Sequence, residues 1–381
     1  MKRFLLAFLL LTACGALQDS ASEHTQRVLE QAALELIETH NVPGVAVGLI
    51  EDGVPTDIYT FGLADKTTGI PITSDTGFNV GSISKTITAW AVMHLVERGL
   101  VELDTSYEKY VTRWRIPTSE FDASKVTVRS LLNHTSGLAQ WAVPQFEAGE
   151  QIPLLETSLS DDKNLAGERA VLGFEPGTQW RYSGAGYSLL QLLIEEVSGE
   201  SYASFVNRVI FKPLGMQDSS FILSDDVLQT SAKGYDASGD ETALVRFAAI
   251  SAAGLHTTPG DLAKFAAAAL PTANGESAGR QMLSSQSIHM MTRTEVSASS
   301  SDANVVNRNY GLGYFVINET PRFFGHGGDN RGWHARIVLY PETNNGFVIL
   351  TNSSNGFAVA EALNCHLGIQ LGNASVSECP T

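Results

Sequence analysis

Apolar residues near the N-terminus follow a helical period and then a strand period. Positions three or four apart predict an amphipathic helix that ends before Pro43-Gly44: Val28, Leu29, Ala32, Leu36 and Ile37. The run from Val45 to Ile50 predicts a buried strand, and Ile58 to Leu63 predicts its hairpin partner after a turn at Asp52-Gly53. The chain therefore opens with a helix and a hairpin.

Strand patterns return near the C-terminus. Three apolar segments separated by turn residues predict strands over Tyr310–Val316, His334–Tyr340 and Gly346–Thr351, and a last helix is expected over Ala358–Leu371. With the N-terminal hairpin, these strands would form one antiparallel sheet flanked by the terminal helices. The pattern predicts an α/β (α+β) domain assembled from residues 26–98 and 302–372.

The intervening residues, 99–301, show helical patterns and long loops with little strand alternation. Helices are expected over Tyr187–Val197 and Tyr202–Ile210, and an alanine-rich helix over Asp261–Leu270. This region is predicted to be an inserted, mostly helical domain.

Composition limits the classes of partner. The 381 residues carry 25 basic and 41 acidic side chains, for a net charge of −16, which disfavours nucleic acid and anionic membrane surfaces. The sequence has no Cys-x-x-Cys or His-Glu-x-x-His motif, and its histidines lack ligand spacing, so we expect neither a metal nor another cofactor. The expected partner is a small-molecule or peptide substrate, and the oligomeric state stays open.

The first residues have the pattern of an export signal. Lys2 and Arg3 precede an apolar run from Phe4 to Leu11, which is too short to span a bilayer. The following Leu-Thr-Ala-Cys14 resembles a bacterial lipobox, which implies removal of residues 1–13, lipidation of Cys14 and a polar tether over 14–25. This lipid anchor is the only membrane contact that we expect. It would hold the protein in the cell envelope, on the periplasmic side of a membrane if the source is Gram-negative. The alternative is an ordinary secretory signal.

Two further cysteines lie near the C-terminus. Cys365 and Cys379 could form a disulfide in an exported protein, and that bond would hold the tail at 373–381.

The segment Gly81-Ser82-Ile83-Ser84-Lys85 is the strongest candidate for chemistry. An apolar run from Ile87 to Val96 follows it and ends before Gly99, so Ser82 is predicted at a helix N-terminus. Lys85 would lie one turn along the same face, within reach of the Ser82 hydroxyl. The unpaired N–H groups of the first turn suit a developing oxyanion, and apolar surroundings would favour neutral Lys85.

Ser-x-x-Lys alone is a weak signal, because the chain contains two more copies. Ser106/Lys109 and Ser160/Lys163 both lie in polar, charged settings typical of solvated turns. Context must therefore decide between the copies.

Two later segments supply that context. Tyr182 lies on a glycine-rich loop directly before a predicted helix, where its phenol could project into a cleft. His326 follows Phe323-Phe324-Gly325 and precedes Gly327-Gly328, so it would lie where a strand opens into glycines that allow close approach of a substrate.

The order Ser-x-x-Lys, Tyr-x-(Asn), (Lys/His)-x-Gly resembles that of the penicillin-recognising serine hydrolases. Four further stretches look like the broad β-lactamase-related group: LLNHTSGL at 131–138, FEPGTQWRYSGAGYSLLQLLIEEVSG at 174–199, FKPLGM at 211–216 and AAGLHTTPGDLAKF at 252–265. That group includes class C β-lactamases, D-alanyl-D-alanine carboxypeptidases, D-aminopeptidases and family VIII esterases. The resemblance implies a β-lactamase/transpeptidase-like fold.

The resemblance also implies roles. Ser82 would be the acylated nucleophile, Lys85 its proton partner and Tyr182 the general base, and His326 would occupy the cation position of the third motif. The backbone amides of Ser82 and Asp329 would stabilise the oxyanion. Three glycines would lie in the substrate-binding site: Gly184, Gly327 and Gly328.

Two departures from the class C pattern affect the expected substrate. Gly184 stands where those enzymes have Asn, and His326 replaces a lysine that would hold a substrate carboxylate more firmly at neutral pH. Both changes favour a hydrolase of D-amino-acid peptides or amides, or an esterase of the family VIII type, over an efficient β-lactamase.

The sequence also admits two rival interpretations. Gly275-Glu276-Ser277-Ala278-Gly279 matches the nucleophile elbow of α/β-hydrolases, but an alanine-rich helix and a polar loop precede it instead of a buried strand, so Ser277 is expected on a surface loop. The protein could also bind cell-wall peptides without turnover, although the complete Ser82, Lys85 and Tyr182 set favours catalysis.

Overall fold

A nine-stranded sheet forms the centre of the computed structural model, which describes residues 21–138, 140, 142–147, 149–160, 169–298 and 308–373. The strand order is β3-β2-β1-β13-β12-β11-β10-β9-β8, and every neighbouring pair is antiparallel. The strands are β1 Gly44–Glu51, β2 Val54–Asp65, β3 Ile70–Pro71, β8 Val296–Ala298, β9 Arg308–Tyr310, β10 Phe315–Ile317, β11 Phe323–Asn330, β12 Trp333–Tyr340 and β13 Asn345–Thr351.

The sheet joins the two ends of the chain. β1 pairs with β13, with Val45 opposite Thr351, so the N-terminal hairpin continues directly into the C-terminal strands. The predicted antiparallel sheet and the α/β class are confirmed.

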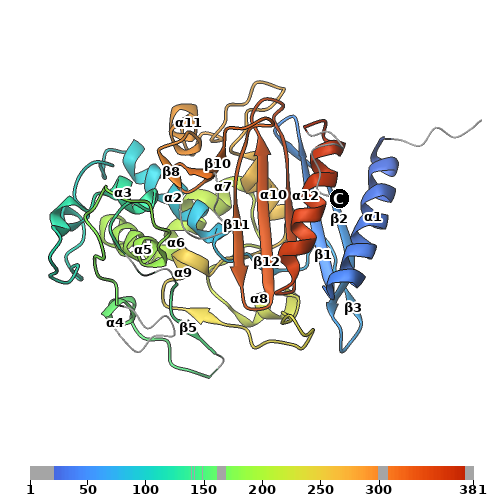
Figure 1. The fold of residues 1–381 in the computed structure, drawn as a ribbon, viewed down its shortest axis with the longest axis horizontal. Coiled ribbons are helices and arrows are strands. Elements are labelled where there is room, and N and C mark those ends of the chain that lie inside the picture. Colours follow the sequence, from blue (N-terminus) through green and yellow to red (C-terminus); the bar gives the residue numbers. More distant parts are fainter. Residues whose placement is uncertain are drawn as a thin grey trace, which may run out of the picture.

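Helices cover both faces of this sheet (Figure 1). α1 Ala21–His40 and α12 Gly356–Gln370 pack side by side on one face, where they meet the alternate β1 residues Val45, Val47 and Leu49. The other face contacts α10 Pro259–Ala267 and α2 Ile83–Glu97. Because both faces are covered, β1 is apolar along nearly its whole length.

The remaining elements form the mostly helical part of the molecule. Its longest helix, α5 Gly184–Ser198, ends at Gly199, which takes the left-handed conformation (φ +70°). The other helices are α3 Val128–Leu132, α4 Leu155–Ser160, α6 Tyr202–Val206, α7 Lys212–Leu214, α8 Asp225–Thr230, α9 Ile250–Ala253 and α11 Ser285–Thr292, with 3₁₀ turns at Tyr107–Lys109 and Ala123–Lys125 and a π-helical turn at Asn207–Phe211. Two short pairs complete it: β4 Phe78–Asn79 with β7 His256–Thr257, and β5 Gln145–Phe146 with β6 Arg246–Phe247.

Three details differ from the sequence predictions. The strand expected over Tyr310–Val316 is in fact two strands, β9 and β10, because Gly311 and Gly313 form a turn; Gly313 has φ +85°. β8 joins the sheet although it lies within 99–301, the range predicted as helical. Helix α1 begins at Ala21, inside the stretch 14–25 predicted as a tether.

Some predictions fall outside the described residues, including those on Cys14, Lys163 and Cys379. Cys365 in α12 is disulfide-bonded, and its predicted pairing with Cys379 stays a prediction. Among the described residues, no helix has both the length and the apolar character needed to cross a membrane.

Candidate active site

Ser82 and Lys85 meet at the start of α2. Ser82 is the residue that precedes the helix, and Gly81 before it has φ +50°. The Lys85 ammonium nitrogen, Nζ, lies 3.1 Å from Ser82 Oγ and donates a second hydrogen bond of 2.8 Å to the Ala252 carbonyl. The contact expected from the helical spacing is therefore present.

The surroundings of Lys85 lower its affinity for a proton. Its side chain is buried, and Nζ lies 4.9 Å from the centre of the Tyr182 ring and 5.8 Å from that of Tyr187. Burial lowers the pKa of Lys85 from 10.5 to about 7, because the charged form loses its hydration. Near neutral pH, a substantial fraction of Lys85 can accept a proton.

Tyr182 also contacts the nucleophile. It lies just before α5, whose N-cap is Ser183, and its side chain hydrogen-bonds to that of Ser82. Burial raises the pKa of the Tyr182 phenol, and the hydrogen bond to Ser82 only partly offsets this. An un-ionised phenol hydrogen-bonded to Ser82 can relay a proton, whereas Lys85 is the better primary acceptor.

A ring cluster fixes the position of Tyr182. The His134 ring lies 4.3 Å from the Tyr182 ring, centre to centre, and Phe315 stacks on Tyr182 nearly parallel at 6.4 Å. His134 Nδ1 accepts the Ser183 backbone N–H at 3.1 Å, which ties the histidine to the start of α5. Sequence reasoning assigned no role to His134; the LLNHTSGL stretch was the available signal.

His326 lies beside Tyr182 but is already engaged by its neighbours. The two rings are 6.2 Å apart. His326 Nδ1 lies 2.5 Å from the Gly327 carbonyl oxygen and Nε2 lies 3.1 Å from the Tyr310 hydroxyl. A carbonyl only accepts, so His326 donates from Nδ1 to Gly327, whereas Nε2 and the Tyr310 hydroxyl can exchange donor and acceptor roles. Because both ring nitrogens already have partners, this arrangement does not favour His326 as the group that holds a substrate carboxylate.

The backbone of β11 approaches the N-terminus of α2 very closely. A Cβ on Gly81 would lie 2.7 Å from Asp329 N, and a Cβ on Gly328 would lie 2.9 Å from Ser82 N and collide with the Val80 carbonyl. Glycine is therefore required on both sides of this contact. The approach brings the amides of Ser82 and Asp329 together, as the predicted oxyanion role needs.

Two side-chain amides, from buried Asn79 and half-buried Asn330, hold this contact in register. Asn330 donates from Nδ2 to Asn79 Oδ1 at 2.5 Å and to the Ala253 carbonyl at 3.1 Å. Asn79 Oδ1 also accepts the Gly81 N–H at 3.0 Å, so one side chain links β11 to the turn before Ser82. His256 contacts Asn79 from the other side at 3.1 Å, and burial lowers its pKa to about 4, so it stays neutral. Sequence reasoning did not find this network.

The other predicted glycines lie in two settings. Gly184 is buried as the first residue of α5. Gly327 is half-buried on β11, and a Cβ there would meet only the Ala335 carbonyl, at 3.8 Å. Their roles in substrate binding stay predictions.

Ser277 lies apart from this site. It is exposed on a loop that follows α10, so it lacks the buried strand that a nucleophile elbow requires. It borders a cavity of about 360 Å³ that contains neither Ser82 nor Lys85.

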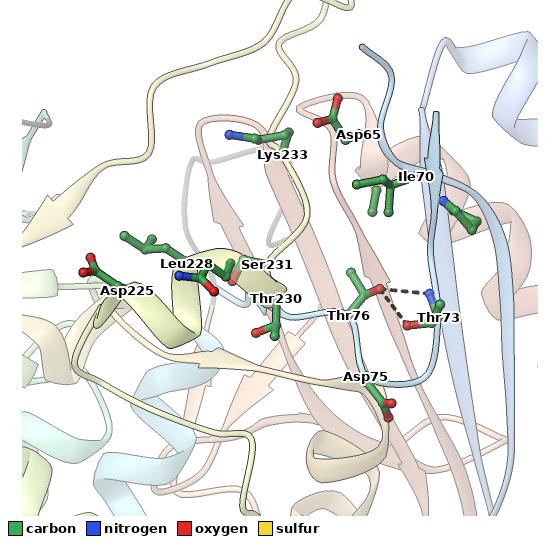
Figure 2. Close-up of a pocket in the computed structure, with 13 residues that line it drawn as sticks. Asp65, Ile70, Thr73, Asp75, Thr76, Asp225, Leu228, Thr230, Ser231 and Lys233 are labelled. Atoms are coloured by element: carbon green, nitrogen blue, oxygen red, sulfur yellow. Dashed lines mark hydrogen bonds between the residues drawn. The ribbon is translucent and has the colours of Figure 1, made fainter. Parts of the chain in front are cut away.

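A larger cavity, of about 600 Å³, also lies away from the nucleophile. Figure 2 shows its walls, which come from the β2–β3 hairpin, the segment leading to Thr76, and α8 with the residues after it. Asp65, Asp75, Asp225 and Lys233 line it, but none of the predicted catalytic residues does. Within the described ranges, no group of His, Cys, Asp and Glu side chains could hold a metal ion.

Fold and site together define the class of protein. In this class, a sheet domain and a helical part meet at a serine–lysine pair, which lies at the N-terminus of a helix. The family model described as Beta-lactamase matches residues 29–365. The chain therefore belongs to the beta-lactamase family, and the resemblance inferred from its motifs is confirmed.

Two relatives illustrate the range of this family. Penicillin-binding protein 4* of Bacillus subtilis is 32% identical over 230 residues, which are 58% of this chain and 46% of that protein. Esterase EstB of Burkholderia gladioli is 33% identical over 172 residues, 43% of each chain. The matches thus span less than half the length of either relative.

Solved structures give the same picture of the fold. The octameric penicillin-binding protein homologue from Pyrococcus abyssi has a TM-score of 0.73 and 26% identity, with 90% of this chain and 77% of that chain covered. A class C β-lactamase has a TM-score of 0.71 and 21% identity over 90% of this chain and 96% of that one. At that identity, the second likeness concerns the fold alone.

Proposed function

We propose that the protein is a serine hydrolase that works through an acyl-enzyme on Ser82. The observation that carries this proposal is the 3.1 Å contact between Lys85 Nζ and Ser82 Oγ, with the Lys85 pKa lowered to about 7. A lysine that is partly neutral at physiological pH, hydrogen-bonded to a serine at a helix N-terminus, is an activated nucleophile pair.

Acylation follows from this geometry. Neutral Lys85 takes the proton of the Ser82 hydroxyl while Oγ attacks the substrate carbonyl carbon, and the amides of Ser82 and Asp329 stabilise the oxyanion. When the intermediate collapses, the bond to the leaving group breaks, and the proton returns from Lys85 through the Tyr182 hydroxyl to that group. Water then attacks the carbonyl carbon of the Ser82 ester and gives one proton through the Tyr182 hydroxyl to Lys85. When this intermediate collapses, the bond between Ser82 Oγ and the acyl carbon breaks, Oγ takes that proton back from Lys85, and the acid departs.

For the substrate we propose D-amino-acid peptides or amides, or esters. Gly184 supplies no amide side chain, and both ring nitrogens of His326 are engaged, so neither residue favours the acylamino and carboxylate groups of a β-lactam. The similarity to esterase EstB supports a carboxylesterase as the second candidate, and a weak β-lactamase remains a third. A binding protein without turnover is the non-enzymatic alternative.

Intact-protein mass spectrometry tests the nucleophile. The protein is incubated with a fluorescent penicillin and, separately, with a fluorophosphonate that phosphonylates activated serines, alongside Ser82→Ala and Ser277→Ala. We expect an adduct with at least one probe in the wild type and in Ser277→Ala, and none in Ser82→Ala. Labelling that survives Ser82→Ala would overturn the proposal, and failure of both probes on the wild type would favour the binding protein.

We also propose that the protein is an exported lipoprotein anchored through Cys14, on the strength of its Leu-Thr-Ala-Cys sequence. Expressed in a bacterial host, the wild type should incorporate radiolabelled palmitate and enter the detergent phase of Triton X-114. Cys14→Ser should do neither, and a variant that still partitions into detergent would contradict the anchor.

A further inference from the structure

Tyr182 lies outside any regular element. It belongs to the loop just before α5, and its side chain is only half-buried. A tyrosine in such a setting can turn to another rotamer unless neighbouring groups confine its ring. The proton relay proposed above needs the phenolic oxygen to stay within hydrogen-bond reach of Ser82. The group that confines Tyr182 therefore affects proton transfer.

His134 contacts three consecutive residues around the phenol. Its backbone carbonyl accepts the Arg181 N–H at 2.9 Å, and its Nδ1 accepts the Ser183 N–H at 3.1 Å. Its ring lies 4.3 Å from the Tyr182 ring, centre to centre, with an angle of 36° between the two planes. One residue thus holds the backbone on both sides of Tyr182 and the ring between them.

Among the rings that the structure describes, that of His134 is the nearest to Tyr182. The ring centres of Trp180 and Phe315 each lie 6.4 Å from that of Tyr182, and the centre of His326 lies 6.2 Å away. Removal of the imidazole would therefore open a space on the most closely packed side of the phenol, into which the Tyr182 ring could shift.

The backbone of His134 is held in an unusual conformation. Its φ is +63°, in the left-handed region that residues with a side chain seldom adopt. Strain of this kind persists only where the surrounding contacts impose it, and it is typical of functional sites. The hydrogen bonds to Arg181 and Ser183 are such contacts. The strain at His134 therefore supports a functional role for its side chain.

The His134 ring is neutral and carries its proton on Nε2. A backbone N–H only donates, so Nδ1 must present a lone pair to Ser183. The residue is 1% exposed, and burial, together with the charges of Lys85 and His326, keeps the pKa of His134 well below 6.5. Nε2 has no hydrogen-bond partner among the described residues, so Ser183 alone orients the ring through a hydrogen bond.

We infer that His134 is a positioning residue, which holds the Tyr182 hydroxyl where it passes a proton to the leaving group. This inference rests on the proposed acyl-enzyme mechanism and adds a residue that acts through Tyr182 instead of on the reacting atoms. Loss of the imidazole should slow chiefly those acylations in which the leaving group must receive a proton.

The test compares leaving groups that differ in their need for a proton. p-Nitrophenolate leaves as a stable anion, whereas methoxide must be protonated as it departs. Acetyl and N-acetyl-D-alanyl groups are each supplied as the p-nitrophenyl ester and as the methyl ester, and kcat/KM is measured for all four compounds. The ratio of methyl to p-nitrophenyl ester is internal to one protein, so a smaller folded fraction does not change it.

His134→Asn is the main variant. Asparagine tolerates positive φ and places Oδ1 where it can accept the Ser183 N–H, so this variant removes mainly the ring. A displacement of a reacting group by about 1 Å can cost about 10²-fold in rate. We therefore expect His134→Asn to lower the methyl/p-nitrophenyl ratio by about 10²-fold. His134→Gly, which adopts the same φ without strain, is the second variant if His134→Asn does not fold.

A double variant separates positioning from a general effect on structure. In Tyr182→Phe the hydroxyl is absent, so the ratio should already be low, and the double variant His134→Asn/Tyr182→Phe should show no further fall. His94→Asn is the matched control, because His94 is also buried and meets another ring, Phe205, edge-on at 6.0 Å. It lies in the last turn of α2, whereas Ser82 precedes the first, so it should keep the wild-type ratio.

The outcomes distinguish this inference from the proposed function. A wild-type ratio in His134→Asn and His134→Gly, or an equal fall with and without the Tyr182 hydroxyl, would overturn the inference and leave the hydrolase proposal intact. If neither His134 variant folds, the residue is structural and the inference is wrong. A wild type that hydrolyses none of the four esters would count against the proposed function, and against this inference with it.

Discussion

The burial of Lys85 should make the native protein less stable than a variant without the charge. Lys85→Met keeps a long, flexible side chain but removes the ammonium, together with its hydrogen bonds to Ser82 Oγ and the Ala252 carbonyl. We expect the variant to be inactive and, at neutral pH, more resistant to unfolding than the wild type. The Lys85 side chain that activity requires would then lower the stability of the native protein.

The magnitude follows from the pKa of Lys85. A fall from 10.5 to about 7 corresponds to about 5 kcal/mol, because each pKa unit is worth 1.36 kcal/mol. Below pH 7 the whole penalty is present. Between pH 7 and 10.5 the unfolded chain binds a proton that the native lysine has released, so wild-type stability rises with pH across that window.

The two lost hydrogen bonds offset part of this gain, at about 1 kcal/mol each. Lys85→Met should therefore be roughly 2–3 kcal/mol more stable than the wild type at pH 7, and about equally stable at pH 9, by linkage between protonation and folding. From pH 7 to pH 9, the difference in unfolding free energy between Lys85→Met and the wild type should fall by about 2.5 kcal/mol. This change does not depend on the hydrogen bonds, because their contribution is the same at both pH values.

Urea unfolding, followed by tryptophan fluorescence at pH 6, 7, 8 and 9, measures both free energies of unfolding. Lys109→Met is the control, since Lys109 belongs to another Ser-x-x-Lys copy but its side chain is 62% exposed. Its difference from the wild type should vary little with pH. A Lys85→Met difference that stays constant from pH 6 to 9 would refute the claim that Lys85 is desolvated and partly neutral.

Three further outcomes are expected of catalysis. The rate of Ser82 acylation should rise with pH and reach half its maximum near pH 7, because neutral Lys85 accepts the proton and its pKa is about 7; a pre-steady-state pH profile that is flat from pH 6 to 8 would argue for another base. Tyr182→Phe should lower kcat by about 10²–10⁴ if the phenol relays the proton, and a loss under ten-fold in steady-state assays would remove it from that path. Gly328→Ala should abolish turnover and lower stability, because the new methyl group would collide with the Val80 carbonyl oxygen. In Gly327→Ala the methyl group would meet only the Ala335 carbonyl oxygen, at 3.8 Å, so this variant should fold with a wild-type thermal midpoint. Equal stability of the two variants would contradict the close approach of β11 to α2.

The contact between Ser82 and Lys85 could be predicted because it is local. Helical spacing alone places residues three apart on one face, and the apolar run after Lys85 indicated burial. Tyr182 could be placed near a cleft by its position before a helix. By contrast, the partners of His326 depend on the β9–β10 turn, which brings Tyr310 to its Nε2. The apolar residues from Tyr310 to Val316 led to the prediction of a single strand there. Gly311 and Gly313 within this segment were the indication of a turn.

His134 and Asn79 could not be predicted for a different reason. Each acts through residues far along the chain: His134 through Ser183 at the start of α5, and Asn79 through Asn330 at the end of β11. The LLNHTSGL stretch marks His134 as part of the family resemblance, but the local pattern around either residue does not indicate these distant partners. A buried histidine or asparagine can form hydrogen bonds with many different partners. Which partners it has is determined only when the sheet has assembled.

The oxyanion position shows why assembly matters most at this site. Its two amides come from Ser82 and Asp329, and they meet because Gly81 and Gly328 permit a backbone approach that any Cβ would block. The Asn79–Asn330 hydrogen bond then fixes the register of that approach. A substitution in this contact should therefore change transition-state stabilisation without touching the nucleophile, its lysine or the phenol. Loss of kcat with an unchanged thermal midpoint is the expected signature of Asn330→Ala, and loss of both together would place Asn330 in folding instead.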